Sequence, residues 1–187
     1  MKKTVSLIAL LLLPLCAMRA AEPDTQAASP ARFVWGAEIG SSIDMSGNDM
    51  SSIDIDASFG LSRSWLRMLG VGTGAHIMVS NSCRTFPIYA VFRTDFSPRP
   101  RLLFLDLRGG MALNYLDYNR RINGAYAQIG MGLRLATGRT FSSHLIFGYK
   151  YAQRGEYEYS DGAAPATVHT IRYDDMHYAF VRLGVSF

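Results

Sequence analysis

The chain has 187 residues, which is long enough for one domain or two small ones. Of these residues 49% are apolar and 18% charged, and this composition excludes a disordered or collagen-like chain. Its mean hydropathy is +0.06, and no stretch after the N-terminal segment approaches the roughly 20 apolar residues of a spanning helix, which excludes a polytopic helical membrane protein. The basic residues behind the net charge of +4 are dispersed rather than clustered, which argues against a nucleic-acid-binding protein.

Residues 1–20 predict a signal peptide that is cleaved on export. Lys2 and Lys3 precede an apolar run over residues 5–16, and small residues surround the expected cleavage site after Ala20. The apolar run is too short for a spanning helix and has the order of regions that a secretory signal requires.

Residues 21–31 are small and polar and predict a mobile leader. From residue 32 onward, apolar residues recur at every second position, which is the period of a β-strand. The alternating segments are residues 33–44, 53–62, 71–80, 88–96, 103–114, 127–135, 144–151 and 179–187. Reversals join these eight segments without any helix-length connection between them. The sequence therefore predicts an all-β, eight-stranded antiparallel meander over residues 32–187.

The two faces of the predicted strands differ in charge. The apolar phase contains no Asp, Glu, Lys or Arg. The other phase is rich in glycine and holds these charged residues: Glu38, Asp54, Asp56, Arg93, Asp95, Asp106, Arg108, Arg134, Lys150 and Arg182. Glycine fits a narrow space better than an exposed strand. We therefore expect the charged phase to line a narrow lumen as a salt-bridge network and the apolar phase to face lipid, where a mid-depth Lys or Arg would cost about 2–4 kcal/mol.

The connections alternate in character along the chain. Residues 63–69, 97–100 and 137–140 predict periplasmic turns, the first of them apolar and lying at the membrane interface. The predicted outer loops lie near residues 45–50, 81–85, 116–124 and 153–172. Candidate loop contacts for an unknown extracellular partner are Tyr118, Arg120, Arg121, Tyr157 and Tyr159. Tyr and Arg often anchor interfaces, although the same residues equally suit interfacial aromatics and lipopolysaccharide-facing charges.

The signal peptide, the eight alternating strands and the alternating run over residues 179–187 resemble the small bacterial outer-membrane barrels of the OmpX and OmpA-transmembrane-domain type. This resemblance covers residues 32–187. It implies an up-and-down transmembrane β-barrel in the outer membrane, surrounded by lipid and lipopolysaccharide. It also implies that Leu183, Val185 and Phe187 form the signal read by the barrel-assembly machinery.

Two short motifs suggest a ligand but have simpler explanations. Asp54 and Asp56 have the spacing of a metal-binding pair, yet strand geometry places both on the inner face beside available bases. The glycine-rich residues 70–75 lack the strand, helix and βαβ unit of a dinucleotide site. We expect no metal and no cofactor.

The expected function is a non-enzymatic structural or surface-interaction role, because eight strands leave a lumen only wide enough for side chains. A soluble periplasmic ligand-binding barrel is one alternative. A lipid A-modifying enzyme is another, and it would need a Ser or His with an orienting carboxylate at the outer rim. His169 and His177 lie near Asp174 and Asp175 but have no Ser partner at a suitable spacing.

Overall fold

The computed structural model describes residues 30–63, 66–80, 82–96, 102–116, 120–159 and 168–187. The strands are β1 (Arg32–Asp44), β2 (Ser52–Arg63), β3 (Leu66–Met78), β4 (Arg84–Asp95), β5 (Leu103–Leu116), β6 (Arg120–Thr137), β7 (Ser142–Tyr159) and β8 (Val168–Ser186). No helix among the described residues is long and apolar enough to cross a membrane. The predicted signal peptide, residues 1–20, and most of the predicted leader, residues 21–31, lie outside the described ranges.

The eight strands form one closed antiparallel barrel in chain order. Each strand pairs with the next one, and β8 closes the barrel by pairing with β1, where Ile39 lies opposite Leu183. Where every strand has a neighbour on both sides, closure leaves no open sheet edge, so the strand N–H and C=O groups find partners within the barrel wall. The predicted eight-stranded up-and-down β-barrel is therefore confirmed.

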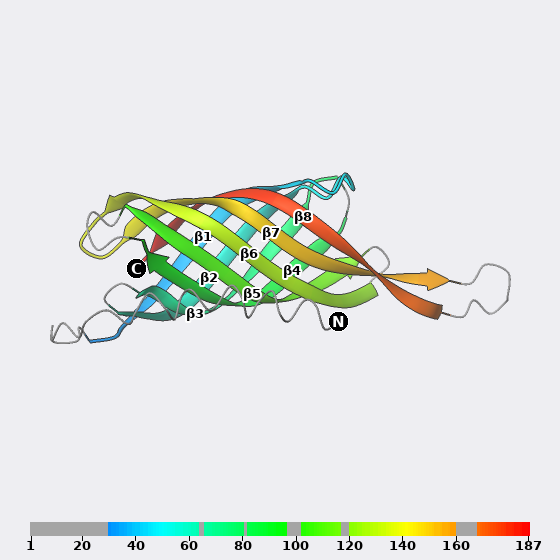
Figure 1. The fold of residues 1–187 in the computed structure, drawn as a ribbon, viewed down its shortest axis with the longest axis horizontal. Helices are drawn as coiled ribbons and strands as arrows, with labels where there is room; N and C mark the ends of the chain where they lie inside the picture. Colours follow the sequence, from blue (N-terminus) through cyan, green and yellow to red (C-terminus); the bar gives the residue numbers. More distant parts are fainter. Residues whose placement is uncertain (1–29, 64–65, 81, 97–101, 117–119, 160–167) are drawn as a thin grey trace.

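The two ends of the barrel differ in shape (Figure 1). At one end, here called the turn end, the connections join β2 to β3, β4 to β5 and β6 to β7. At the other, here called the hairpin end, β7 and β8 continue past their neighbours as a long paired hairpin that reaches Tyr159 and Val168.

Side chains alternate between the outside and the lumen along each strand. On β2, Ile53 and Ile55 are each 50% exposed on the outside, whereas Asp54 and Asp56 are buried inside. Exposed apolar residues on the other strands include Trp35, Ile39, Leu69, Val71, Ile88, Met111, Ile129, Met131, Phe147, Val181 and Leu183. The outer wall is thus an apolar belt.

Charges on the outside are confined to the ends of the barrel. Among the strand residues with described side chains, the exposed charged ones are Arg32, Arg63, Arg84 and Asp175. The first three lie at strand ends. Asp175 lies on the part of β8 beyond the end of β1, whose last residue pairs with Tyr178.

The lumen also contains large apolar side chains, which the prediction of a compact, charged interior did not include. One buried cluster contains Phe104, Ile146 and Phe180, and a second contains Met68, Tyr89, Val91, Ala112 and Tyr126. These side chains and the charged ones together fill the interior, as expected for a barrel of eight strands.

The turn predicted over residues 63–69 is shorter in the structure, because β2 ends at Arg63 and most of the segment belongs to β3. β3 begins at Leu66, and Met68 is buried in the lumen with 1% of its surface exposed. A register shift lies between Leu66 and Met68 where β3 pairs with β4. Such an irregularity interrupts the period of two, so alternation alone does not reveal the start of this strand.

The predicted outer loops over residues 116–124 and 153–172 are largely strand. Arg120 and Arg121 begin β6, and Tyr157 and Tyr159 lie on β7 with backbone partners on β8. Four of the five candidate loop contacts therefore belong to strands at the hairpin end, and Tyr118 lies outside the described residues.

The pair Asn123-Gly124 has turn-forming composition but lies within β6. A Cβ atom on Gly124 would collide with the backbone carbonyl oxygen of Gln153. Glycine here permits close approach to the neighbouring strand rather than a reversal of the chain.

Gly132 shows how tightly the lumen is packed, because the Phe104 ring lies directly against it. We expect Gly132→Val to lower the free energy of unfolding by about 1–3 kcal/mol, the usual cost of overpacking a filled interior. Gly109→Val is the matched control, since a Cβ atom at this outward position meets nothing within 4 Å. Urea titration of both variants in lipid vesicles measures the difference, and equal stabilities would contradict the filled lumen.

Candidate functional site

The first charged cluster in the lumen contains Glu38, Asp106, Arg93 and Arg108 and is here called the Glu38 cluster. Arg93 donates to Glu38 Oε1 at 2.6 Å and, through Nε, to Asp106 Oδ2 at 2.7 Å. Arg108 donates from Nε to Asp106 Oδ1 at 2.8 Å and also to the second Glu38 oxygen. All four side chains are at most 3% exposed, so these charges neutralise one another away from water.

The second cluster lies closer to the hairpin end and contains Asp54, Asp56, Lys150 and Arg182, here called the Asp54 cluster. Lys150 Nζ donates to Asp54 Oδ2 at 2.9 Å. The Arg182 guanidinium bridges both carboxylates, with Nη2 at 3.1 Å from Asp54 Oδ2 and Nη1 at 3.1 Å from Asp56 Oδ2. The planar fork of arginine suits this bridging role.

Tyr89 connects the two clusters. Its hydroxyl donates to Asp56 Oδ1 at 2.9 Å and accepts from Arg108 Nη1 at 3.0 Å. Its ring stacks on Tyr126 with 5.7 Å between ring centroids. The connected network contains as many carboxylates as cations, so the middle of the lumen is electrically balanced.

Neutral and histidine side chains complete the network, and the sequence analysis did not select them. The Ser42 and Ser52 hydroxyls donate to Asp54 at 2.5 and 2.6 Å. The His76 ring lies 3.7 Å from Asp54 and 3.5 Å from Asp56. These three residues share the inward phase of the neighbouring charges, so the same alternation could have identified them.

The two remaining predicted lumen charges, Asp95 and Arg134, lie at the turn end. Asp95 Oδ1 is 4.0 Å from Arg134 Nη2 and 3.4 Å from Arg67 Nε. The Arg67 guanidinium lies over the Phe104 ring, 4.4 Å from its centroid. Arg67 was not predicted because it falls in the segment assigned to a turn.

The residues of the predicted assembly signal lie on the outside of the barrel, Leu183 and Val185 on β8 and Phe187 directly after it. Leu183 is 51% and Phe187 44% exposed, and Val185 is half-buried. The Phe187 ring stacks on Trp35 with 4.5 Å between centroids, and the backbones of these two residues exchange hydrogen bonds. These aromatic rings lie on the outer wall at the turn end.

The histidines considered for an enzyme do not assemble a described acyl-transfer site. His177 Nδ1 is hydrogen-bonded to the Tyr149 hydroxyl, and the nearby Asp175 accepts a hydrogen bond from Tyr151 at 2.6 Å. A further histidine, His144, lies at the turn end beside Glu38. The side chain of His169 is outside the described part of the structure.

No group of His, Cys, Asp and Glu in the described part of the chain has the arrangement of a metal site. The acidic pair of Asp54 and Asp56 forms ion pairs with Lys150 and Arg182.

No family model and no curated protein matches the chain. Among solved structures, the chain is similar to the solution NMR structure of a de novo designed protein, TMB2.3. The two are 14% identical with a TM-score of 0.39, over 82% of this chain and 92% of the designed one. The fold and the side chains described above are therefore the basis on which a function is inferred.

Proposed function

We propose that this chain is an integral outer-membrane β-barrel with a plugged polar lumen, of the OmpX and OmpA-transmembrane-domain type. Its role is structural or interactive rather than enzymatic, and it needs no cofactor. The signal peptide expected over residues 1–20 supports export, and outer-membrane lipid and lipopolysaccharide are the proposed surroundings.

The observation that carries the proposal is the inverted distribution of polarity across the wall. Val71 is 63% exposed on the outside, whereas Asp54 and Arg182 are at most 1% exposed inside. A water-soluble barrel would fill its interior with apolar side chains and rarely exposes an apolar area larger than a few hundred Å². In a bilayer the same belt contacts hydrocarbon, and closure satisfies the backbone without water.

The filled lumen supports a structural or interactive role over transport. The Glu38 and Asp54 clusters, Tyr89 and the Phe104 ring occupy the interior between the two ends. An ion crossing the barrel would have to break several buried ion pairs, each costly to separate. We therefore propose that the barrel conducts no solute at a substantial rate.

The hairpin end is the proposed contact surface for an extracellular partner. Arg120 and Arg121 on β6 and Tyr157 and Tyr159 on β7 belong to this end, and Tyr118, which is outside the described residues, comes between β5 and β6 in the sequence. The turn end would then face the periplasm. The outward run of Leu183, Val185 and Phe187 on β8 is the proposed contact for the barrel-assembly machinery.

Fractionation of bacteria that produce the chain tests the proposal. We expect the chain in the outer-membrane fraction, released only by detergent, with a gel mobility that changes on heating because the closed barrel resists SDS until it is heated. Purified protein in a planar bilayer should give no large steady conductance. Recovery in the soluble fraction without detergent would contradict the membrane assignment and favour a soluble ligand-binding barrel.

A further inference from the structure

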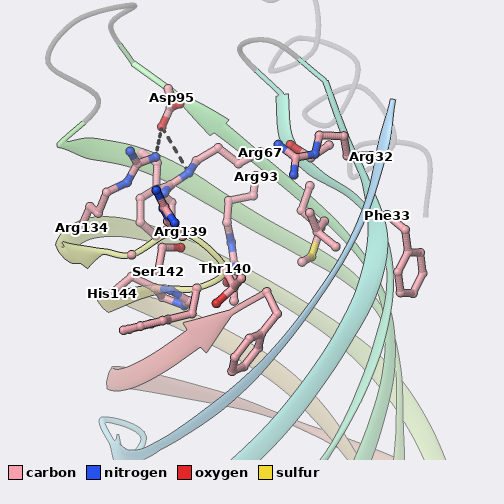
Figure 2. Close-up of a pocket in the computed structure, with 18 residues that line it drawn as sticks. Arg32, Phe33, Arg67, Arg93, Asp95, Arg134, Arg139, Thr140, Ser142 and His144 are labelled. Atoms are coloured by element: carbon pink, nitrogen blue, oxygen red, sulfur yellow. Dashed lines mark ion pairs between the residues drawn. The ribbon is translucent and has the colours of Figure 1, made fainter. Parts of the chain in front are cut away.

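A cavity of about 260 Å³ opens at the turn end of the barrel (Figure 2). The Phe104 ring and His144, which lies beside Glu38 of the Glu38 cluster, form part of its lining. The ends of several strands and the β6–β7 turn contribute the rest. Neither the plugged lumen nor the proposed contact surface at the hairpin end uses this space.

The lining of the cavity carries an excess of positive charge. Its arginines are Arg32, Arg67, Arg93, Arg134 and Arg139. Asp95 is the only residue of the described lining with a carboxylate side chain. Positive charge inside a recess with low-dielectric walls acts more strongly on an anion than the same charge on an open surface.

The ion pairs described among the lining residues leave positive charge in excess. Arg93 is neutralised inside the Glu38 cluster by two carboxylates. Asp95 is then shared between Arg67 at 3.4 Å and Arg134 at 4.0 Å. Arg139 from the β6–β7 turn also lines the cavity (Figure 2). The Asp95 carboxylate therefore faces the guanidinium groups of both Arg67 and Arg134, and the 4.0 Å contact with Arg134 is a weak ion pair.

The cavity also presents hydrogen-bond donors suited to an anion. Arg134 Nε is buried and has no hydrogen-bond acceptor among the described residues. Thr140 and Ser142 place hydroxyl-bearing side chains in the lining. The Arg67 guanidinium is held against the Phe104 ring, which limits its movement. Arginine forks that are fixed in this way match the oxygens of a phosphate group.

The size of the cavity limits the ligand. A volume of about 260 Å³ lies just below the range of about 300–1,000 Å³ that is typical of small-molecule sites. The space suits one compact anionic group, and the acyl chains of a phospholipid would remain outside it. We propose that this cavity binds a phosphate group, carried by a phospholipid headgroup or free in solution, with Arg134 and Arg139 as principal ligands. The proposal stands whether or not the barrel lies in a membrane.

Calorimetric titration of the full chain in non-ionic glucoside micelles tests the site. The two probes are inorganic phosphate and short-chain phosphatidylglycerol. We expect saturable binding of at least one probe, and a loss of affinity of about 10- to 100-fold in Arg134→Gln and in Arg139→Gln, the range for losing a charged hydrogen bond. The matched control is Arg84→Gln, which removes an exposed arginine at the opposite end of the barrel.

Each outcome has a defined meaning. Tighter binding of phosphatidylglycerol than of phosphate supports the site and assigns it to lipid headgroups, and the reverse order assigns it to a soluble phosphate. No saturable binding of either probe overturns the proposal. An equal loss in Arg84→Gln also overturns it, because the attraction would then come from overall charge. Heat-dependent gel mobility of each variant shows separately that the barrel is folded.

Discussion

Replacing Glu38 with glutamine is expected to lower the free energy of unfolding by about 3–5 kcal/mol, the cost of removing one partner from a buried ion pair. The Glu38 carboxylate is 2% exposed and accepts hydrogen bonds from Arg93 and Arg108. Glutamine keeps the shape of the side chain but removes its charge. Arg93 and Arg108 would then depend mainly on the Asp106 carboxylate, with Asp56 as a more distant partner 3.8 Å from Arg108, and both guanidinium groups are almost fully buried.

The matched control for this variant is Asp49→Asn. Asp49 is an exposed residue of the β1–β2 turn with a φ of 54°, a conformation that asparagine also tolerates. We expect its free energy of unfolding to change by less than about 0.5 kcal/mol, as for most surface substitutions. Both variants can be followed by urea titration in lipid vesicles with tryptophan fluorescence. Equal stabilities would show that the Glu38 cluster does not hold the barrel together.

The architecture could be predicted from the sequence because two properties alternate together along the strands. On β2, for example, Ile53 and Ile55 alternate with Asp54 and Asp56. A period of two places the two sets on opposite faces of the sheet, so the only remaining question is which face turns inward. The absence of charge from the apolar phase decides that choice. Alternation did not predict the register shift beside Met68 or the inward position of Phe104. Both residues are apolar, so the charge pattern places them on the outside, yet both are buried in the lumen.

The composition of the site could be predicted from the sequence, but its pairing could not. Alternation predicted an inward position for Glu38 and Arg93, which are 55 positions apart and meet because of barrel closure and strand register. The alternation within a single strand shows neither how the barrel closes nor how the strands are paired in register. The cavity at the turn end was not predicted for the same reason, because it combines Arg67 and Arg139 from segments that were assigned to separate turns.

The hairpin end shows a further limit of local composition. Polar residues with Asn-Gly predict loops, yet β6 begins at Arg120 and β7 extends to Tyr159. Pairing with a neighbouring strand overrides local turn preference where the partner is continuous, as it is between β7 and β8. The proposed contact surface therefore has a strand framework.

The second large effect is expected on the outer wall, from a charge placed in the apolar belt. Val71 lies near the middle of β3 and is 63% exposed on the outside. If the belt lies in lipid, Val71→Arg should lower the free energy of unfolding by about 2–4 kcal/mol, the cost of an arginine near the bilayer midplane. In water the same substitution at an exposed position would have almost no effect.

The most direct test of the membrane assignment compares Val71→Arg with Ile43→Arg in phospholipid vesicles. Ile43 is 64% exposed and Val71 63%, but Ile43 lies next to the end of β1, where the penalty falls to about 0–1 kcal/mol. We predict that urea titration gives a clearly larger loss of stability for Val71→Arg than for Ile43→Arg. Equal and small losses for the two variants, within about 0.5 kcal/mol, would show that the apolar belt does not lie in a membrane.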